Sequence, residues 1–153
     1  MPFNNFNKKI IALEMFDISK EIMVIIKENE DTILSLIRGQ MGSKGTRYDG
    51  KFIRAKYGNA YRDSTVFEKE RHGIGLGKKT DFITMFMKGE FYASLKMSVS
   101  GSSFSVTSDV PYFKEISSWN DDMLLGLDKY NLKYFRDEYI IPGLQRRFKE
   151  LSK

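Results

Sequence analysis

Residues 95–108 contain a hairpin whose register the sequence itself defines. If Gly101 and Ser102 form a two-residue turn, apolar residues face each other on one side of the hairpin and serines on the other. The expected pairs are Ser100 with Ser103, Val99 with Phe104, Ser98 with Ser105 and Met97 with Val106. A shift of one residue would mix the two faces. The sequence therefore predicts a small antiparallel sheet with one apolar face that other elements must cover.

The turn that leads into this hairpin depends on a glycine. Gly89 lies where the apolar segment 82–87 must turn into Phe91 and Tyr92. A residue without a Cβ is expected where the chain takes a positive φ or passes close to other backbone. We therefore expect a positive φ at Gly89 and a core position for Phe91.

Helical periodicity dominates the first forty residues. Polar residues recur at three- or four-residue steps and leave an apolar stripe formed by Ile11, Met15, Ile18, Ile22 and Ile25. This pattern predicts one amphipathic helix over roughly 8–28, packed on the core. Residues 29–31 offer a break, and Asp31 can cap a second helix that runs to about Gly39.

The last helix is expected to begin at Asp128 and to be interrupted at Pro142. Proline lacks an amide donor and crowds the carbonyl of Glu138, so we expect a kink or break there. The predicted fold class is therefore α+β, in one domain over residues 1–153. A small antiparallel sheet that includes the 95–108 hairpin is covered by N-terminal helices and a kinked C-terminal helix.

Composition narrows the chemistry. The 153 residues include no cysteine and one histidine, which excludes disulfides and thiolate sites and leaves little for a histidine-based triad. No apolar run is long enough to span a bilayer, and the N-terminus lacks the pattern of a signal peptide, so we expect a soluble protein made in the cytoplasm. We expect no enzyme activity, no cofactor and no metal site.

Two motifs could suggest ligands, and neither has the required form. The glycines at 73, 75 and 77 precede Lys78, but a phosphate-binding loop needs four residues between its glycines, and here three separate the outer pair. The dinucleotide pattern fails because its third glycine comes one residue early. The adjacent acids Asp121 and Asp122 fit a loop or helix start better than a metal site.

The segment 44–80 is where the net positive charge of the chain is concentrated. It holds ten Lys or Arg and four Asp or Glu, in a chain of net charge +5. Residues 46–80 follow neither helical nor strand periodicity, which predicts a long basic arm or loop that is functional or orders on assembly. Cations and tyrosines alternate in it as candidate partner-binding residues: Arg47, Tyr48, Lys51, Arg54, Lys56, Tyr57, Tyr61 and Arg62. An acidic protein partner, nucleic acid and a solvated loop all remain open.

The chain resembles the tail-completion and head–tail joining (neck) proteins of tailed bacteriophages, and is closest to virion proteins of Bacteroidales (crAss-like) phages. Residues 86–95 are similar to the family's Leu-x-Thr-Gly-x-Leu/Phe-x-x-Ser-Ile/Leu element, with Gly89, Phe91 and Ser94 at matching positions and Lys88 in place of threonine. The paired strands around Gly101 follow.

Two further stretches carry the same resemblance. Residues 124–127 look like a phenylalanine-glycine-leucine box, with Gly126 retained and Leu125 in place of the aromatic residue. A helix with Pro142 comes after it. Residues 40–53 are similar to the loop that follows the N-terminal helices in these proteins.

The resemblance implies a structural virion protein at the head–tail junction or tail, made in the host cytoplasm. Its subunits would form a ring and contact portal, neck or tail proteins, with possible contact to packaged DNA and no membrane. Nothing in the family pattern implies catalysis or a cofactor. The alternative from the residues alone is a small basic nucleic-acid-binding protein that uses the 44–80 arm.

Overall fold

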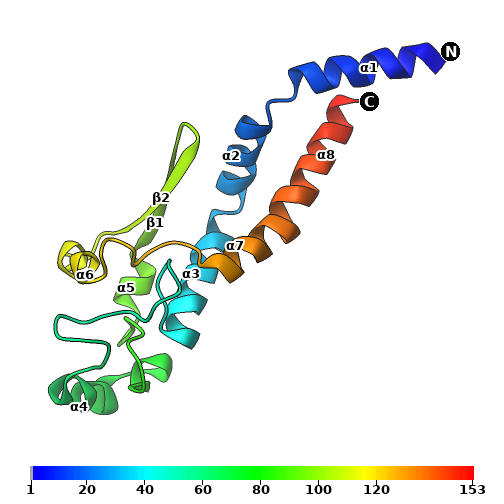
Figure 1. Ribbon diagram of the computed structural model, residues 1–153. Helices are drawn as coiled ribbons and strands as arrows, with labels where there is room; N and C mark the ends of the chain where they lie inside the picture. The colour runs from blue at the N-terminus through cyan, green and yellow to red at the C-terminus, as the bar shows by residue number, and fades with distance from the viewer. Residues whose placement is uncertain (1) are drawn as a thin grey trace.

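The computed structural model describes the backbone of residues 2–153 and the side chains of residues 7–153. The elements are, in chain order, α1 (Pro2–Met15), α2 (Ile18–Glu28), α3 (Glu30–Lys44), α4 (Asp63–His72), the 3₁₀ turn η1 (Gly75–Lys78), α5 (Glu90–Ala93), β1 (Leu95–Ser100), β2 (Ser103–Ser108), α6 (Phe113–Trp119), α7 (Lys129–Phe135), the π-helical turn η2 (Arg136–Ile140) and α8 (Ile141–Leu151). Figure 1 shows an elongated molecule with α1 and the end of α8 at one end and α4 at the other. The fold is α+β, as the sequence predicts.

The β1–β2 hairpin has the predicted register. Val99 pairs with Phe104 and Met97 with Val106, and the pairing continues to Leu95 and Ser108. Gly101 adopts a φ of 58°, the left-handed conformation that a tight turn needs. In the described part of the chain the sheet contains these two strands alone. Its apolar face packs against the core, beside α2 in Figure 1.

The predicted helix over 8–28 is in fact two helices, which corrects that prediction. Asp17 leaves the helical conformation at φ −81° and ψ 96°, and its carboxylate accepts a hydrogen bond from the Lys20 amide at 3.0 Å. This local cap ends α1 and starts α2, because an aspartate side chain can replace helical hydrogen bonds. Ile25 and Ile26 are buried, whereas Met15 is 73% and Ile18 57% exposed, so the stripe reaches the core only in the later part of α2.

The next helix starts earlier and ends later than predicted. Asn29, rather than Asp31, precedes its first residue, and the helix continues through Gly39 to Lys44. A glycine inside a helix costs about 1 kcal/mol, which the burial of Gln40 and Met41 in the following turn offsets. The helix ends where Gly45 takes a left-handed φ of 62°.

The C-terminal helix begins at the predicted cap and is interrupted near the predicted proline. Asp128 accepts a hydrogen bond from the Asn131 amide at 2.8 Å. Between α7 and α8 the backbone widens into the π-helical turn η2, in which the amide of Ile141 donates to the carbonyl of Arg136, five residues back. The interruption directly precedes Pro142, which has no amide to donate.

The segment 44–80 is folded, which corrects the expectation of a structureless connection. It contains α4 and η1, and Ile53 is completely buried in the core. The glycines at 73 and 77, whose spacing does not fit a phosphate-binding loop, allow close backbone packing. A Cβ on Gly77 would lie 1.9 Å from the Met87 carbonyl oxygen, and one on Gly73 would lie 2.3 Å from that of Lys69.

The element before the hairpin has the predicted backbone. Gly89 has a φ of 101° and directly precedes α5, and Phe91 is buried. The Ser94 hydroxyl donates to the Phe91 carbonyl at 2.7 Å and lies 2.6 Å from the hydroxyl of Ser108 at the end of β2. The turn, α5 and the hairpin therefore form one connected unit.

Candidate partner-binding cleft

Arg47 belongs to the protein interior rather than to a free surface. Its side chain is 3% exposed, and the guanidinium bonds both carboxylate oxygens of Asp49, at 2.8 and 3.0 Å. It also lies 3.1 Å from a carboxylate oxygen of Asp121. These hydrogen bonds from Arg47 lower the pKa of Asp49. Arg47 thus fixes the start of the segment and is not available as a free partner-binding cation.

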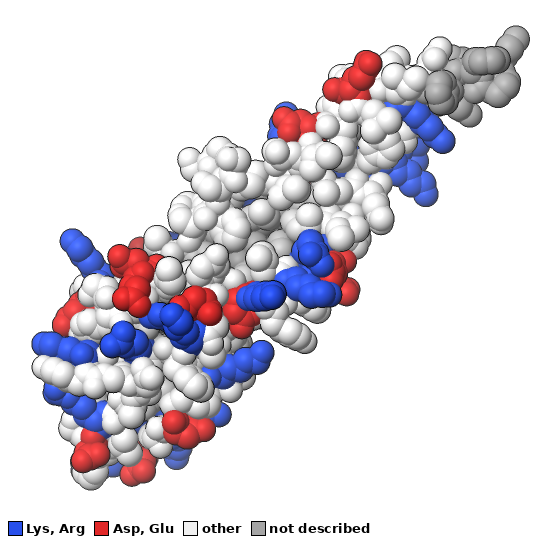
Figure 2. Space-filling view, viewed as in Figure 1, with Lys and Arg blue, Asp and Glu red and all other residues white. Residues whose placement is uncertain are grey.

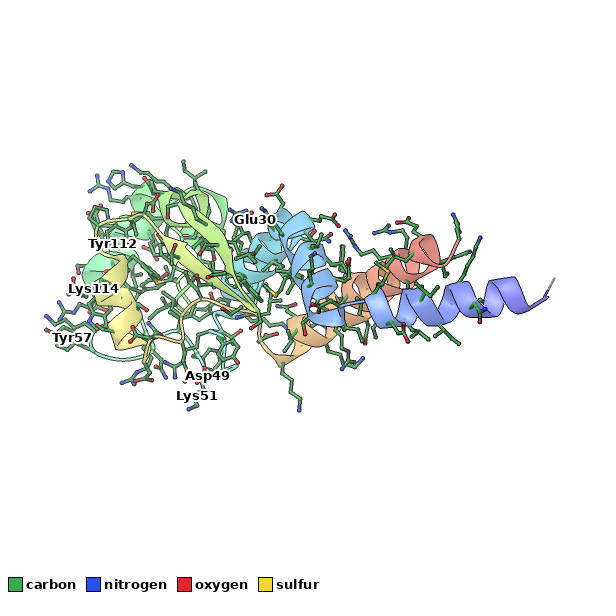
Figure 3. The ribbon with its side chains drawn as sticks, turned by 90° about the horizontal axis from the view of Figure 1, so that it is seen from above. Glu30, Asp49, Lys51, Tyr57, Tyr112 and Lys114 are labelled. Atoms are coloured by element: carbon green, nitrogen blue, oxygen red, sulfur yellow. The ribbon has the colours of Figure 1, made fainter. Side chains whose placement is uncertain are left out.

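Tyr48 and Lys51 have more exposed side chains. The ring of Tyr48 lies over Gly126, where a Cβ would come within 2.8 Å of the ring, so the glycine at 126 makes room for it. Lys51 extends into solvent beside Asp49, with its ammonium 3.6 Å from that carboxylate, and Figure 3 shows the two side by side.

Asn120 holds the backbone of Arg54 in place. The Asn120 side chain accepts a hydrogen bond from the Arg54 amide at 2.8 Å and donates to the Arg54 carbonyl at 3.0 Å. Asn120 itself is completely buried, and it also donates to the Ile116 carbonyl in α6. Because Asn120 bonds both the amide and the carbonyl of Arg54, the backbone at this residue is held in one position. The exposed Arg54 side chain therefore extends into solvent from a fixed point on the surface.

Lys56, Tyr57 and Arg62 form a small exposed cluster. The Arg62 guanidinium carbon lies 4.1 Å from the centre of the Tyr57 ring, and the Lys56 ammonium 5.5 Å from it. The charge of Lys56, with hydrogen bonds from Lys56 and Arg62, lowers the pKa of the Tyr57 hydroxyl. Tyr57 lies at the end of the molecule opposite α1 in Figure 3.

Tyr61 is partly buried and lines two of the hollows on this surface, so its ring is not exposed for stacking on a base. Its hydroxyl accepts a hydrogen bond from the Thr84 amide at 2.9 Å. Thr84 is completely buried, and its carbonyl accepts a hydrogen bond from the Tyr92 hydroxyl at 2.6 Å. Burial raises the pKa of Tyr92. The ring of Tyr61 is thereby fixed against the core.

Lys69 is the residue that sequence reasoning missed. It is 1% exposed, its ammonium donates to the Phe86 carbonyl, and it lies 4.7 Å from the centre of the Tyr61 ring. Within the described residues it forms an ion pair with no carboxylate. The signal that could have revealed it is the spacing of Thr65, Val66 and Lys69, which places the three on one face of a helix.

Three hollows share lining residues from one to the next, and we call them together the arm cleft. The first, of about 770 Å³, is lined by residues that include Arg47, Lys51, Arg54 and Asp121. The second, of about 550 Å³, shares Gly58 and Asn59 with the first and adds Lys56, Tyr57, Arg62, Glu115 and Trp119. The third, of about 290 Å³, shares Tyr61 and Thr65 with the second and ends at Lys69.

The lining of the arm cleft contains more Lys and Arg than Asp and Glu. Figure 2 shows Lys and Arg side chains gathered with fewer Asp and Glu over the α4 end of the molecule. Among the described residues, no three His, Asp or Glu side chains are placed to hold a metal ion. His72 faces Glu68 one helical turn away, at 3.7 Å on the surface. None of the described helices is long and apolar enough to cross a membrane.

Comparison with known proteins gives no relative: no family model, no curated protein and no solved structure matches this chain. A functional proposal therefore rests on this chain's own features. These are the short motifs around Gly89 and Gly126 and the geometry of the surface.

Proposed function

We propose that the protein is a structural virion subunit of a tailed phage. It is a head–tail connector or tail-completion subunit that assembles with copies of itself into a ring and joins the portal or neck to the tail. The motifs at Gly89 and Gly126 support the family, and the hairpin that follows Gly89 supports it further. The observation that carries the assembly part of the proposal is the surface of α1.

The middle of α1 carries four consecutive apolar residues, Ile10 to Leu13, between the charged Lys9 and Glu14. Each residue of a helix is rotated by about 100° from the one before, so Ile10, Ile11, Ala12 and Leu13 point in four different directions. Ala12 is covered, whereas Ile11 is 54% and Leu13 is 64% exposed. Exposed apolar residues gathered in this way are typical of a surface that contacts another protein.

Among the side chains that the structure describes, from residue 7 onward, α1 makes few contacts with the rest of its own subunit. The α1 helix contacts α8, and after its end Phe16 packs edge-on against Phe148 with ring centres 5.4 Å apart. An isolated helix of about 12–15 residues is only marginally stable in water. A neighbouring subunit that covers the exposed sides of α1 would remove this apolar surface from water and stabilise the helix.

The test is the size of the purified chain in solution, measured by sedimentation velocity and native mass spectrometry over a range of concentrations. We expect one closed oligomer of defined size. Leu13→Glu should dissociate it, because the charge would be buried in the interface. Lys9→Glu is the matched control, since it places the same side chain on the same helix at an already charged position.

Two results would overturn the proposal. The assembly part fails if the wild-type chain stays monomeric at every concentration, or if both variants behave alike. The virion part predicts a fixed, small copy number per particle. Quantitative mass spectrometry of purified particles that does not detect the chain would reject it.

A further inference from the structure

We infer that the arm cleft binds an acidic polypeptide segment, one carboxylate of which docks on the ammonium of Lys69. The inference deepens the proposed function, on which it rests, because the segment would belong to a neighbouring virion protein. Three observations carry it: unpaired cations along the cleft, a buried ammonium without a counterion at its end, and walls that fit a peptide better than a nucleotide chain.

The cations along the cleft are free to meet an anionic partner. Arg54, Lys56 and Arg62 are exposed, and within the described residues none of them forms an ion pair with a carboxylate. Lys51 has one such neighbour, Asp49, at 3.6 Å. Complementary charge of this kind steers a partner and fixes its register.

The buried ammonium of Lys69 is the feature of the cleft that most specifically calls for a carboxylate. An ammonium has three donors, and that of Lys69 bonds one acceptor, the Phe86 carbonyl, and lies over the Tyr61 ring. Burial of a charge is costly unless an opposite charge accompanies it. Glu90 lines the same hollow but does not pair with Lys69. A carboxylate entering this hollow would provide the missing counterion.

The walls of the cleft favour a peptide over a nucleic acid. The hollow at Lys69 is walled by Met85, Phe86 and Phe91, apolar side chains that suit the stem of a peptide side chain better than a hydrated sugar and phosphate. Glu115 and Asp121 line the other two hollows, where they can accept hydrogen bonds from peptide N–H groups, donors that a phosphate backbone lacks.

The aromatic side chains fit the same partner. Tyr57 already holds the guanidinium of Arg62 against its ring, so this ring is not free to stack on a base. Trp119, in α6, lines the second hollow and offers apolar surface. The recognised segment therefore combines carboxylates with apolar side chains.

The test is binding of labelled peptides to the full chain, measured by fluorescence anisotropy at low and at physiological salt. The probes are a short peptide of Glu, Phe and Gly, its counterpart with Gln in place of Glu, and single-stranded oligo(dT). We expect binding of the Glu peptide alone. Lys69→Met should weaken it about tenfold in a variant that circular dichroism shows to be folded, because the change removes the cation that meets the carboxylate.

The matched variants separate binding from folding. Arg54→Glu should also weaken peptide binding. Lys20→Glu reverses a charge at an exposed position of α2, outside the arm cleft, and should leave peptide binding unchanged. The inference is overturned if oligo(dT) binds more tightly than the Glu peptide, if the Gln peptide binds equally well, or if the folded Lys69→Met variant binds the Glu peptide as tightly as wild type. Loss of peptide binding in a chain that still oligomerises would reject this inference alone.

Discussion

The side-chain oxygen of Gln40 accepts a hydrogen bond from the side-chain amide of Asn131 at 3.1 Å, although the two residues lie on different helices, 91 positions apart. The same oxygen accepts from the Asp128 amide at 2.8 Å, and the Gln40 nitrogen donates to the Gly126 carbonyl at 3.2 Å. Gln40 is 2% and Asn131 8% exposed. This buried network fastens the start of the C-terminal helix to α3.

We predict that Gln40→Leu destabilises the protein by about 2–3 kcal/mol. The change leaves the Asp128 amide and the Gly126 carbonyl buried without this partner, and each such group costs about 1–3 kcal/mol. Urea unfolding followed by circular dichroism measures the effect. Gln145→Leu, at an exposed position of α8, is the control and should change stability by less than about 0.5 kcal/mol. Equal effects of the two changes would contradict a special role for Gln40.

Gly89→Val should damage folding and assembly more than Lys88→Thr. Gly89 has a φ of 101°, which a β-branched residue adopts only under strain, at a cost of about 1–3 kcal/mol. The strain would displace Phe91 and the hairpin behind it. Lys88 is exposed, and threonine is the residue usual in the resembling family. The measurements are urea midpoints and incorporation into particles; wild-type behaviour of Gly89→Val in both would refute the prediction.

Two glycines should respond to alanine in opposite directions. Gly39 lies inside α3, and a Cβ there would meet nothing within 4 Å, so Gly39→Ala should stabilise the protein by up to about 1 kcal/mol. Gly77→Ala should destabilise it, because the new Cβ would collide with the Met87 carbonyl oxygen. Thermal unfolding of both variants is the check. If the unfolding temperature shifted in the same direction in both variants, the backbone around Gly77 would have to move aside for the new Cβ at little cost in stability.

The Arg47–Asp49 pair should make stability depend on acid pH. The folded-state pKa of Asp49 lies below its usual value, so the folded state favours the ionised carboxylate. This contribution is present above the unfolded pKa of about 4 and is lost as the pH falls through the lower folded pKa. Wild type should exceed Asp49→Asn in urea midpoint at pH 7, and the gap should narrow below about pH 4. A gap that is constant with pH would exclude the ionised pair as its cause.

Local rules were sufficient for several elements. The register of the hairpin around Gly101, the positive φ of Gly89 and the cap at Asp128 depend on residues within a few positions of each other, and all three are confirmed. The α+β class follows from the same patterns. The helix boundary at Asp17 was missed, because an apolar stripe continues across it while the aspartate side chain ends the hydrogen-bonded helix.

The candidate site was predicted in part. The sequence identified the exposed cations Arg54, Lys56 and Arg62, since clustered charge is visible without a structure. It placed Arg47 among them, although burial and two carboxylates, one of them 74 residues away, turn that arginine inward. It did not identify Lys69 at all.

By itself, the sequence determined those features whose energies arise between near neighbours: the hairpin pairing, the turn glycines and a helix cap. The tertiary structure alone decided which charges are buried and which surfaces stay open. Lys69 is enclosed because Tyr61 and Phe86, from segments before and after α4, close over it. The two sides of α1 at Ile11 and Leu13 stay open because α8 covers only one side. Burial is set by contacts between distant segments, which no local pattern records.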